Sequence, residues 1–258
     1  MRVVFLTTKR PFGALLLKQI KGQNISLDAI FIENPKFRHR LRGAIRRLGL
    51  AKTLKVALKR LPGVVVPKMG EDWLSNAFYL TYSDKVYIVD DFNGKRCEQL
   101  LREIKPDLVV LGRSRIIRKN VINIPRIGIL NAHPGLLPKY RGIDTVEWAV
   151  YNGGDVGVTI HFIDEGVDTG GIIVQKTVNI EVSDTIASLT HKANTIAAEL
   201  MTETVLRIME GEDIRITPQS IEDGRQYFKM PRDLLRQTEQ RLLRIAEEQK
   251  IMQEKSGE

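Results

Sequence analysis

The first 32 residues of the chain read MRVVFLTTKRPFGALLLKQIKGQNISLDAIFI. Residues 3–6 form a continuous β-branched and aromatic run, which is typical of a strand buried on both faces. Residues 11–20 have the apolar content of a helix with Pro11 near its start, and a second strand-like run follows at residues 27–32. A strand, a helix and a strand in this order predict a parallel sheet flanked by helices.

The same alternation continues along the chain. Further strands are expected at residues 85–89, 107–111, 127–131, 156–163 and 172–180. Further helices are expected at residues 94–104, 116–122, 144–151 and 184–209, the last with Ser183 or Asp184 as its N-cap, and from Pro231 onward. This order predicts an α/β fold with a mostly parallel sheet.

The composition is that of a globular protein. The 258 residues are 43% hydrophobic and 28% charged, and no apolar run approaches the roughly 20 residues of a membrane-spanning helix. The first residues lack the features of a signal peptide, so we expect a cytoplasmic protein. The single cysteine, Cys97, lies in a helix-like pattern and is interpreted as a packing residue.

The positive charge is concentrated in one segment. The chain carries a net charge of +9, and residues 36–60 contain ten Lys or Arg and no acidic residue. Apolar spacing within residues 36–61 predicts two short amphipathic helices. The segment is interpreted as a solvated helical surface, with a polyanion-binding site or an anionic membrane contact as alternatives.

The polar residues with the clearest chemical potential follow the strand at residues 127–131. Asn131 and His133 lie two residues apart at its carboxyl end, which is where ligands bind in open α/β sheets. Residues two apart on an extended chain point to the same side, so the amide and the imidazole are expected to converge. Both side chains can donate a hydrogen bond to a developing oxyanion.

A second polar group comes from residues 157–170. His161 lies on a predicted strand, and Asp168 lies in a loop bounded by glycines. An Asp in such a loop can orient a water or an imidazolium, although a turn residue and a hydrogen-bonded core histidine are equally simple interpretations. The spacing of His133, His161 and Asp168 matches no metal-binding motif, so no metal is expected.

Two motifs in this region resemble the formyltransferases that use 10-formyltetrahydrofolate. The family pattern Asn-x-His-Pro-Ser-Leu-Leu-Pro is matched by NAHPGLLP from Asn131 to Pro138, with Gly135 in place of the usual Ser. The later family pattern is matched by GVTIH from Gly157 and by Val-Asp-Thr-Gly around Asp168. The resemblance covers residues 85–210 well and the first 35 residues in layout only. It implies a Rossmann-like, doubly wound, mostly parallel sheet.

The resemblance also implies residue roles. Asn131, His133 and Asp168 would be catalytic, with Asp168 keeping His133 charged. The formyl donor, 10-formyltetrahydrofolate, would lie against eight further residues, namely Arg115, Ile116, Ile117, Ile122, His161, Ile163, Asp164 and Val167. The amine acceptor would contact the first loop through Lys9 and Arg10, and would contact Tyr140 and Arg141 beside the catalytic loop.

The acceptor itself is less clearly indicated. The first loop lacks the small residues with which glycinamide ribonucleotide formyltransferases hold a phosphate, and the residues after Met209 do not resemble the C-terminal domain of methionyl-tRNA formyltransferases. We therefore expect an amino sugar on a nucleotide carrier. Three alternatives stay open. The acceptor would be methionyl-tRNA, which makes a nucleic acid the partner, or the enzyme would hydrolyse formyltetrahydrofolate instead of transferring the formyl group. In the third, the chain would be a binding protein without catalytic activity.

The organisation expected from these patterns has two parts. Residues 1–210 would form the catalytic domain, with residues 36–61 as a basic insertion. Residues 211–258 would form a C-terminal extension whose charged helix is interpreted as a surface or homodimer-contact helix.

Overall fold

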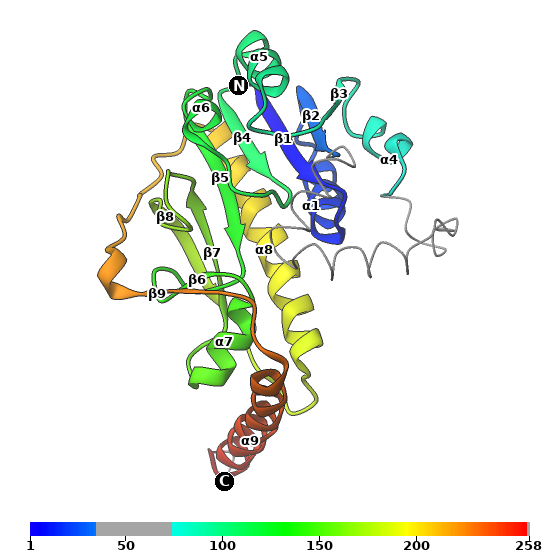
Figure 1. Ribbon diagram of the computed structural model, residues 1–258. Helices are drawn as coiled ribbons and strands as arrows, with labels where there is room; N and C mark the ends of the chain where they lie inside the picture. Colours follow the sequence, from blue (N-terminus) through cyan, green and yellow to red (C-terminus); the bar gives the residue numbers. More distant parts are fainter. Residues whose placement is uncertain (35–73, 257–258) are drawn as a thin grey trace, which may run out of the picture.

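The computed structural model describes residues 1–34 and 74–256 (Figure 1). The predicted basic insertion, residues 36–61, lies outside these residues. Seven strands in the described part of the chain form one sheet. Their spatial order is β3 (Val86–Val89), β2 (Ala29–Glu33), β1 (Val3–Thr8), β4 (Leu108–Leu111), β5 (Gly128–His133), β7 (Gly157–Phe162) and β8 (Ile172–Thr177).

The sheet is mostly parallel, as the sequence predicts. The first five strands in the spatial order pair in parallel, whereas β7 pairs antiparallel with both β5 and β8. The chain winds from β1 outward to β2 and later returns to place β4 on the other side of β1. This reversal of winding direction creates a crevice at the carboxyl ends of β1 and β4, where open α/β sheets bind their ligands.

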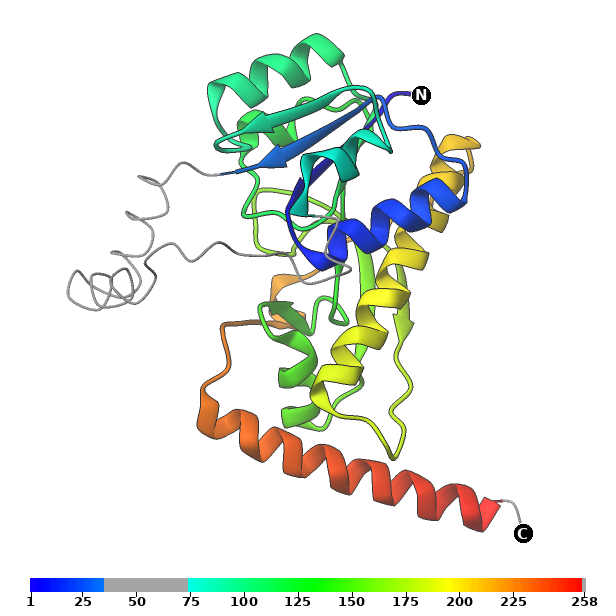
Figure 2. The same cartoon turned by 90° about the vertical axis from the view of Figure 1, so that its right-hand side faces the viewer.

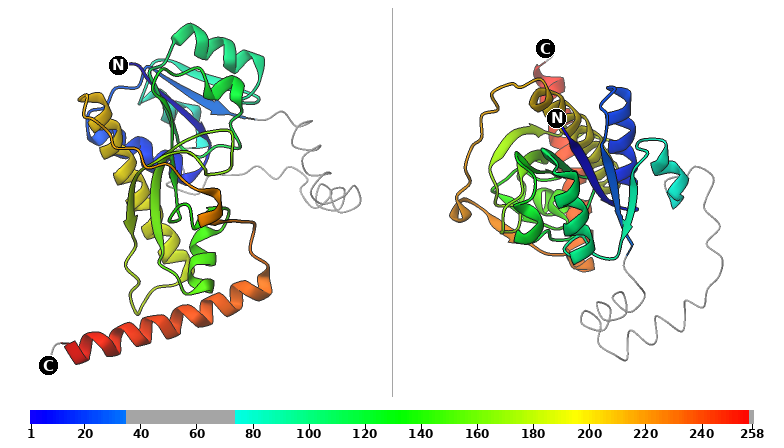
Figure 3. Two further views of the ribbon diagram at one scale, coloured as in Figure 1. Left: turned by 90° about the vertical axis from the view of Figure 1, so that its left-hand side faces the viewer. Right: turned by 90° about the horizontal axis from the view of Figure 1, so that it is seen from above.

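Alternate residues of the strands point to opposite faces of the sheet and pack into two separate hydrophobic cores. Val3 and Phe5 pack on the same side of the sheet as α1 (Pro11–Gly22) and α8 (Ile186–Met209). Val4 and Leu6 pack on the opposite side, with α5 (Lys95–Ile104). Figure 3 shows these helices on the two sides of the strands. A strand buried on both faces explains why residues 3–6 are apolar without alternation.

Two helix starts differ from the predictions. The N-cap of α8 is Thr185, which accepts a hydrogen bond from the Ser188 N–H at 3.1 Å while the Ser188 hydroxyl accepts one from the Thr185 N–H at 2.9 Å. This reciprocal capping box replaces the predicted Ser183 or Asp184 cap. The helix predicted at residues 116–122 is only α6 (Lys119–Ile122), and the preceding residues form a loop.

The chain after α8 returns to the sheet's carboxyl edge. It passes through a short 3-10 helix, η2 (Ile221–Asp223), and β9 (Arg225–Tyr227), which pairs in parallel with β6 (Tyr140–Gly142). This two-stranded sheet was not predicted. Because β9 joins β6 beside the loop that follows β5, residues after 210 take part in building this edge of the domain.

The remaining helices are α4 (Asn76–Leu80), α7 (Thr145–Asn152) and α9 (Arg232–Ser256). The first half of α9 packs against α7, and its second half continues away from the body of the domain (Figure 2). None of the helices in residues 1–34 and 74–256 combines the length and the apolar character needed to cross a bilayer.

Candidate active site

Asn131 and His161 form a cross-strand pair at the centre of the carboxyl edge. They lie directly opposite each other on β5 and β7, and their side chains share one face of the sheet. His161 Nδ1 lies 2.7 Å from the Phe162 carbonyl oxygen, which can only accept a hydrogen bond, so Nδ1 carries the proton. His161 Nε2 is therefore an acceptor, and Asn131 Nδ2 donates to it at 3.1 Å. This bond fixes which end of the Asn131 amide is the donor.

His133 follows two residues after Asn131 on the same face. Its Nε2 lies 2.7 Å from the Tyr140 carbonyl oxygen, so Nε2 also carries a proton. The other ring nitrogen, Nδ1, faces Asp168 Oδ2 at 3.5 Å. The tautomer is therefore set by a backbone carbonyl, and Nδ1 remains as the atom that can take up or release a proton.

Asp168 stands between the two histidines. Its Oδ2 accepts a hydrogen bond from the Gly142 N–H at 2.9 Å, and its Oδ1 lies 3.7 Å from His161 Nε2. Its backbone has φ +55°, a left-handed conformation that Asp tolerates better than most residues. Gln219 Nε2 donates to the Asp168 backbone carbonyl at 3.2 Å and so holds the loop.

The charge state of the histidines differs from the expectation. Burial lowers the pKa of His133 below its usual value of 6.5, and the nearby Asp168 carboxylate offsets this only in part. Burial, and then the neighbouring His133, lower the pKa of His161 to about 4. Both imidazoles are therefore neutral at pH 7 in the resting site, and the expectation that Asp168 keeps His133 charged is wrong for this state.

Gly135 leaves room for the His133–Tyr140 hydrogen bond. A Cβ atom at position 135 would lie 2.8 Å from both His133 Nε2 and the Tyr140 carbonyl oxygen. The loop around it is held by Thr159, whose hydroxyl donates to the Gly135 carbonyl at 2.7 Å and accepts from the Leu137 N–H at 3.1 Å. Gly135, which replaces the Ser of the family pattern, therefore stands where the His133 ring and the Tyr140 carbonyl approach the backbone closely.

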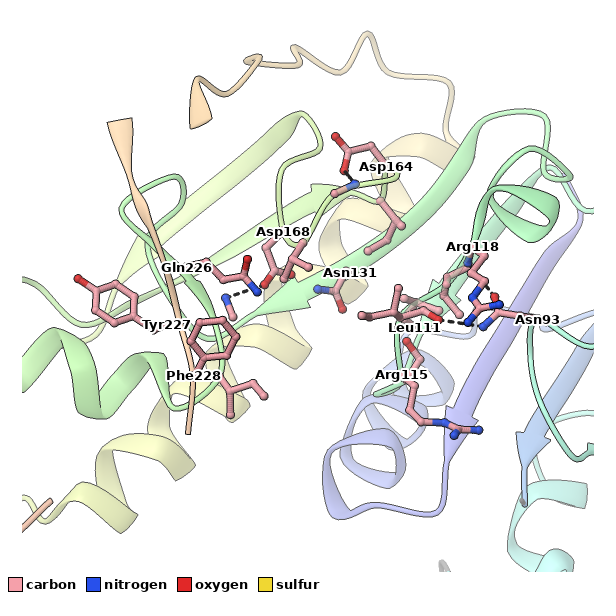
Figure 4. A pocket seen from close by; sticks show the side chains of 18 of the residues that line it. Asn93, Leu111, Arg115, Arg118, Asn131, Asp164, Asp168, Gln226, Tyr227 and Phe228 are labelled. Atoms are coloured by element: carbon pink, nitrogen blue, oxygen red, sulfur yellow. Dashed lines mark hydrogen bonds between the residues drawn. The ribbon is translucent and has the colours of Figure 1, made fainter. Parts of the chain in front are cut away.

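A pocket of about 820 Å³ opens beside Asn131 and Asp168 (Figure 4). Such a volume is typical of small-molecule sites. Six of the eight residues predicted to contact the formyl donor line it: Arg115, Ile116, Ile117, Ile163, Asp164 and Val167. The other two do not. His161 is fully buried beneath Asn131, and Ile122 packs into the core beside α5.

Two side chains from neighbouring strand ends hold the pocket wall formed by residues 115–118. The buried Glu33 carboxylate, at the end of β2, accepts hydrogen bonds from Arg115 Nε at 2.9 Å and Nη2 at 2.8 Å. Asn93 donates to the Ile116 carbonyl at 2.9 Å and accepts from the Arg118 N–H at 2.7 Å. These bonds take the place of intrahelical ones and explain why the predicted helix does not begin at residue 116.

The predicted acceptor residues of the first loop do not reach this pocket. Lys9 Nζ donates to the Leu74 carbonyl at 2.6 Å and to Asn76 Oδ1 at 2.7 Å, and partial burial lowers its pKa. Arg10 is exposed and precedes the first turn of α1. Neither residue is among those that line the pocket.

Tyr140 and Arg141, the other two predicted acceptor contacts, are both buried. The Tyr140 side chain is 1% exposed, and its ring packs against Tyr227 at a centroid distance of 5.6 Å. Arg141 is buried, and its Nη2 donates to the Ile221 and Gly224 carbonyls at 3.2 Å each. Both side chains contact the segment around β9 and neither is among the residues that line the pocket, so their role as substrate contacts stays a prediction.

Several pocket residues were not anticipated from the sequence. They come from the β3–α5 loop, the β4–α6 loop, the end of β6 and β9: Asp91, Asn93, Ser114, Arg118, Gly142, Ile143, Gln226, Tyr227 and Phe228. Within the described ranges, no group of three or more His, Cys, Asp or Glu side chains is arranged to hold a metal ion.

Comparison with known proteins identifies related sequences. Residues 83–205 match the family model described as formyl transferase. A methionyl-tRNA formyltransferase from Thermodesulfovibrio yellowstonii is 39% identical over 113 residues, which are 43% of this chain and 37% of that protein. One from Clostridioides difficile is 27% identical over 233 residues, 90% of this chain and 65% of that protein. The chain thus spans less than two thirds of the length of these relatives.

The fold also has counterparts among solved structures. The crystal structure of an N-formyltransferase from Helicobacter canadensis, in complex with folinic acid and dTDP-3-aminofucose, superposes with a TM-score of 0.61. The two chains are 18% identical, and the match covers 94% of this chain and 81% of the other. At 18% sequence identity, this similarity shows a shared fold and nothing more.

Proposed function

We propose that this chain transfers a formyl group from 10-formyltetrahydrofolate to an amine, because residues 83–205 match the formyl transferase family model. The observation that carries the proposal is the constellation of Asn131, His133 and Asp168 beside the pocket. The three side chains come from β5 and from the loop before β8, and the His133 Nδ1 atom lies 3.5 Å from Asp168 Oδ2.

The pocket wall is suited to the pterin ring of the donor. Leu111, Ile117 and Val167 provide apolar surface, and the backbone of residues 115–118 is held in place by Glu33 and Asn93. A flat heterocycle with a polar edge fits between apolar walls and fixed backbone groups. The bound donor would supply an activated formyl group at the Asn131 end of this pocket.

Asn131 is assigned to the developing negative charge. As the amine adds to the formyl carbon, charge builds on the formyl oxygen and requires a fixed donor. One hydrogen of Asn131 Nδ2 is bound to His161 Nε2, so the second hydrogen remains for the substrate. His161 acts through Asn131 and is a positioning residue in this scheme.

His133 and Asp168 are assigned to proton transfer. The new bond joins the amine nitrogen to the formyl carbon, the bond from that carbon to N10 of the folate breaks, and one proton must pass from the amine to N10. Neutral His133 can accept this proton at Nδ1 and return it to the departing nitrogen. The Asp168 carboxylate, 3.5 Å from Nδ1, stabilises the imidazolium during the interval.

The proposal includes two classes of acceptor. An amino sugar on a nucleotide carrier is the preferred one, and the dTDP-3-aminofucose in the Helicobacter canadensis complex supports it. The matched sequence relatives, which are methionyl-tRNA formyltransferases, favour methionyl-tRNA as the second candidate.

The test is a turnover assay with a panel of acceptors. The protein is incubated with 10-formyltetrahydrofolate alone, then with dTDP- and UDP-linked amino sugars, and then with methionyl-tRNA, while tetrahydrofolate and formate are measured. Acceptor-dependent release of tetrahydrofolate without formate supports transfer. Formate release without acceptor indicates a hydrolase, and the absence of folate binding would refute the proposal.

A further inference from the structure

The pocket has a second side, away from the predicted donor-binding wall. Figure 4 shows Gln226 and Phe228 on one side of Asn131, and Asn93, Arg115 and Arg118 on the other. We call the residues Ile143, Gln226 and Phe228 the aromatic rim. All three line the pocket.

The rim exposes apolar side chains on a backbone that is firmly held. Phe228 is 68% exposed and Ile143 is 56% exposed. The Ile143 N–H donates to the Tyr227 carbonyl at 3.1 Å, and Trp148 Nε1 donates to the Phe228 carbonyl at 2.8 Å. Exposed apolar side chains on ordered backbone at the mouth of a pocket are typical of a ligand contact.

Tyr227 fixes the direction of the neighbouring ring. Its own side chain turns away from the pocket and packs against Tyr140 and Trp148, with centroid distances of 5.6 and 5.1 Å. Its hydroxyl accepts a hydrogen bond from Asn152 Nδ2 at 3.1 Å. Because Tyr227 is anchored on one side of β9, the next residue, Phe228, is directed to the other side, where the pocket lies.

The rim is adjacent to the catalytic carboxylate and carries no charge. The N–H of Gly142, one residue before Ile143, donates to Asp168 Oδ2 at 2.9 Å. The pocket's arginines, Arg115 and Arg118, lie on the opposite side of Asn131. The rim therefore offers an aromatic face, an aliphatic side chain and the Gln226 amide, which suit a flat uncharged ring with a polar edge and are unsuited to phosphate.

We propose that the aromatic rim binds the nucleobase of the acceptor, with the base stacked on Phe228. This inference rests on the proposed function, because the acceptor must reach Asn131 and Asp168 from the side that the donor does not occupy. Nucleotide-linked amino sugars and aminoacyl-tRNA both carry an amine on a nucleotide, so a base-binding surface serves either. The base that binds distinguishes them: thymine or uracil for a sugar nucleotide, and adenine for the 3′ end of a tRNA.

The experiment measures binding of dTDP, UDP, AMP and inorganic pyrophosphate to the full chain by calorimetry. Each titration is run with and without 5-formyltetrahydrofolate, a non-transferring analogue of the donor. At least one nucleotide is expected to bind at least 10-fold more tightly than pyrophosphate. Because base–aromatic stacking contributes about 1–3 kcal/mol, Phe228→Ala should weaken that binding by about 5- to 150-fold.

Two control variants separate stacking from general effects. Phe228→Tyr keeps the ring and should stay within about 3-fold of the native affinity. Leu243→Ala removes another exposed apolar side chain, 57% exposed on α9 and outside the pocket, and should change nothing. Folate binding serves as a folding control, because all three variants should bind the analogue as the native chain does.

The outcomes separate this inference from the proposed function. If folate binds and no nucleotide binds better than pyrophosphate, or if Phe228→Ala leaves nucleotide affinity unchanged, the base-binding rim is refuted while formyl transfer stands. If nucleotides bind through Phe228 and folate does not bind, formyl transfer is refuted while the rim stands.

Discussion

Removing the Asn131 amide should slow formyl transfer without weakening donor binding. Asn131→Ala deletes the Nδ2 hydrogen that is not bound to His161, on a side chain that lines the pocket beside Asp168, while the wall at residues 115–118 stays in place. The substitution therefore removes an interaction that gains strength only as charge develops on the formyl oxygen.

The magnitude follows from two hydrogen bonds. Loss of one preorganised oxyanion donor costs about 3–4 kcal/mol of transition-state stabilisation, so kcat should fall by about 100- to 1,000-fold. The same change leaves the buried His161 Nε2 without its donor, which should lower the free energy of unfolding by about 1–3 kcal/mol.

The assay combines steady-state kinetics with a double-mutant cycle. The kcat and the KM for 10-formyltetrahydrofolate are measured for Asn131→Ala, for His161→Asn and for the double variant. If His161 acts only through Asn131, the double variant should be no slower than Asn131→Ala alone. A raised KM with unchanged kcat in Asn131→Ala would contradict the assignment, and additive losses in the cycle would contradict the positioning role of His161.

Three further predictions follow from particular contacts. Asn93→Ala removes both hydrogen bonds that hold Ile116 and Arg118, so the KM for the donor should rise by about 10-fold with little change in kcat, whereas a larger effect on kcat would argue against a role in shaping the donor wall. Burial lowers the pKa of His161 from 6.5 to about 4, so the unfolded chain binds more protons between these pH values and this residue should reduce the free energy of unfolding by about 3 kcal/mol as the pH falls from 6.5 to 4. Urea unfolding across this range should show a shallower pH dependence for His161→Asn, and identical slopes would count against a buried neutral histidine. Cys97 is fully buried, and burial raises the pKa of its thiol to about 12, so an aromatic disulfide reagent should label it only at the rate of unfolding; rapid labelling of the native chain would show that α5 is not packed as described.

The parts of the site that could be predicted from sequence depend on local rules. Asn131 and His133 share a face because strand residues alternate. They lie at the carboxyl edge of the sheet because they end β5, which is parallel to β4. The apolar runs of β1 and β2 predicted burial on both faces, because successive strand residues point to opposite faces and all of them are apolar here. These features follow from residues adjacent in the sequence.

The parts that were missed depend on contacts between distant segments. The proton on His133 Nε2 is set by the Tyr140 backbone carbonyl, which carries no sequence signal. The sequence around Tyr140 and Arg141 does not reveal that β6 pairs with β9, more than 80 residues away, or that both side chains are buried. A parallel pair of three residues has no detectable periodicity, so Phe228 could not be assigned to the pocket in advance.

The central claim is that His133 and Asp168 move a proton while Asn131 holds the oxyanion. Its most direct test follows transfer of an isotope-labelled formyl group from 10-formyltetrahydrofolate to the acceptor in a single turnover, for the native chain and for Asp168→Asn. The labelled N-formyl product should form with the native chain at least about 100-fold faster than with Asp168→Asn, and both chains should bind the donor equally well. Equal rates of transfer, or no labelled product from the native chain with any acceptor, would contradict the account.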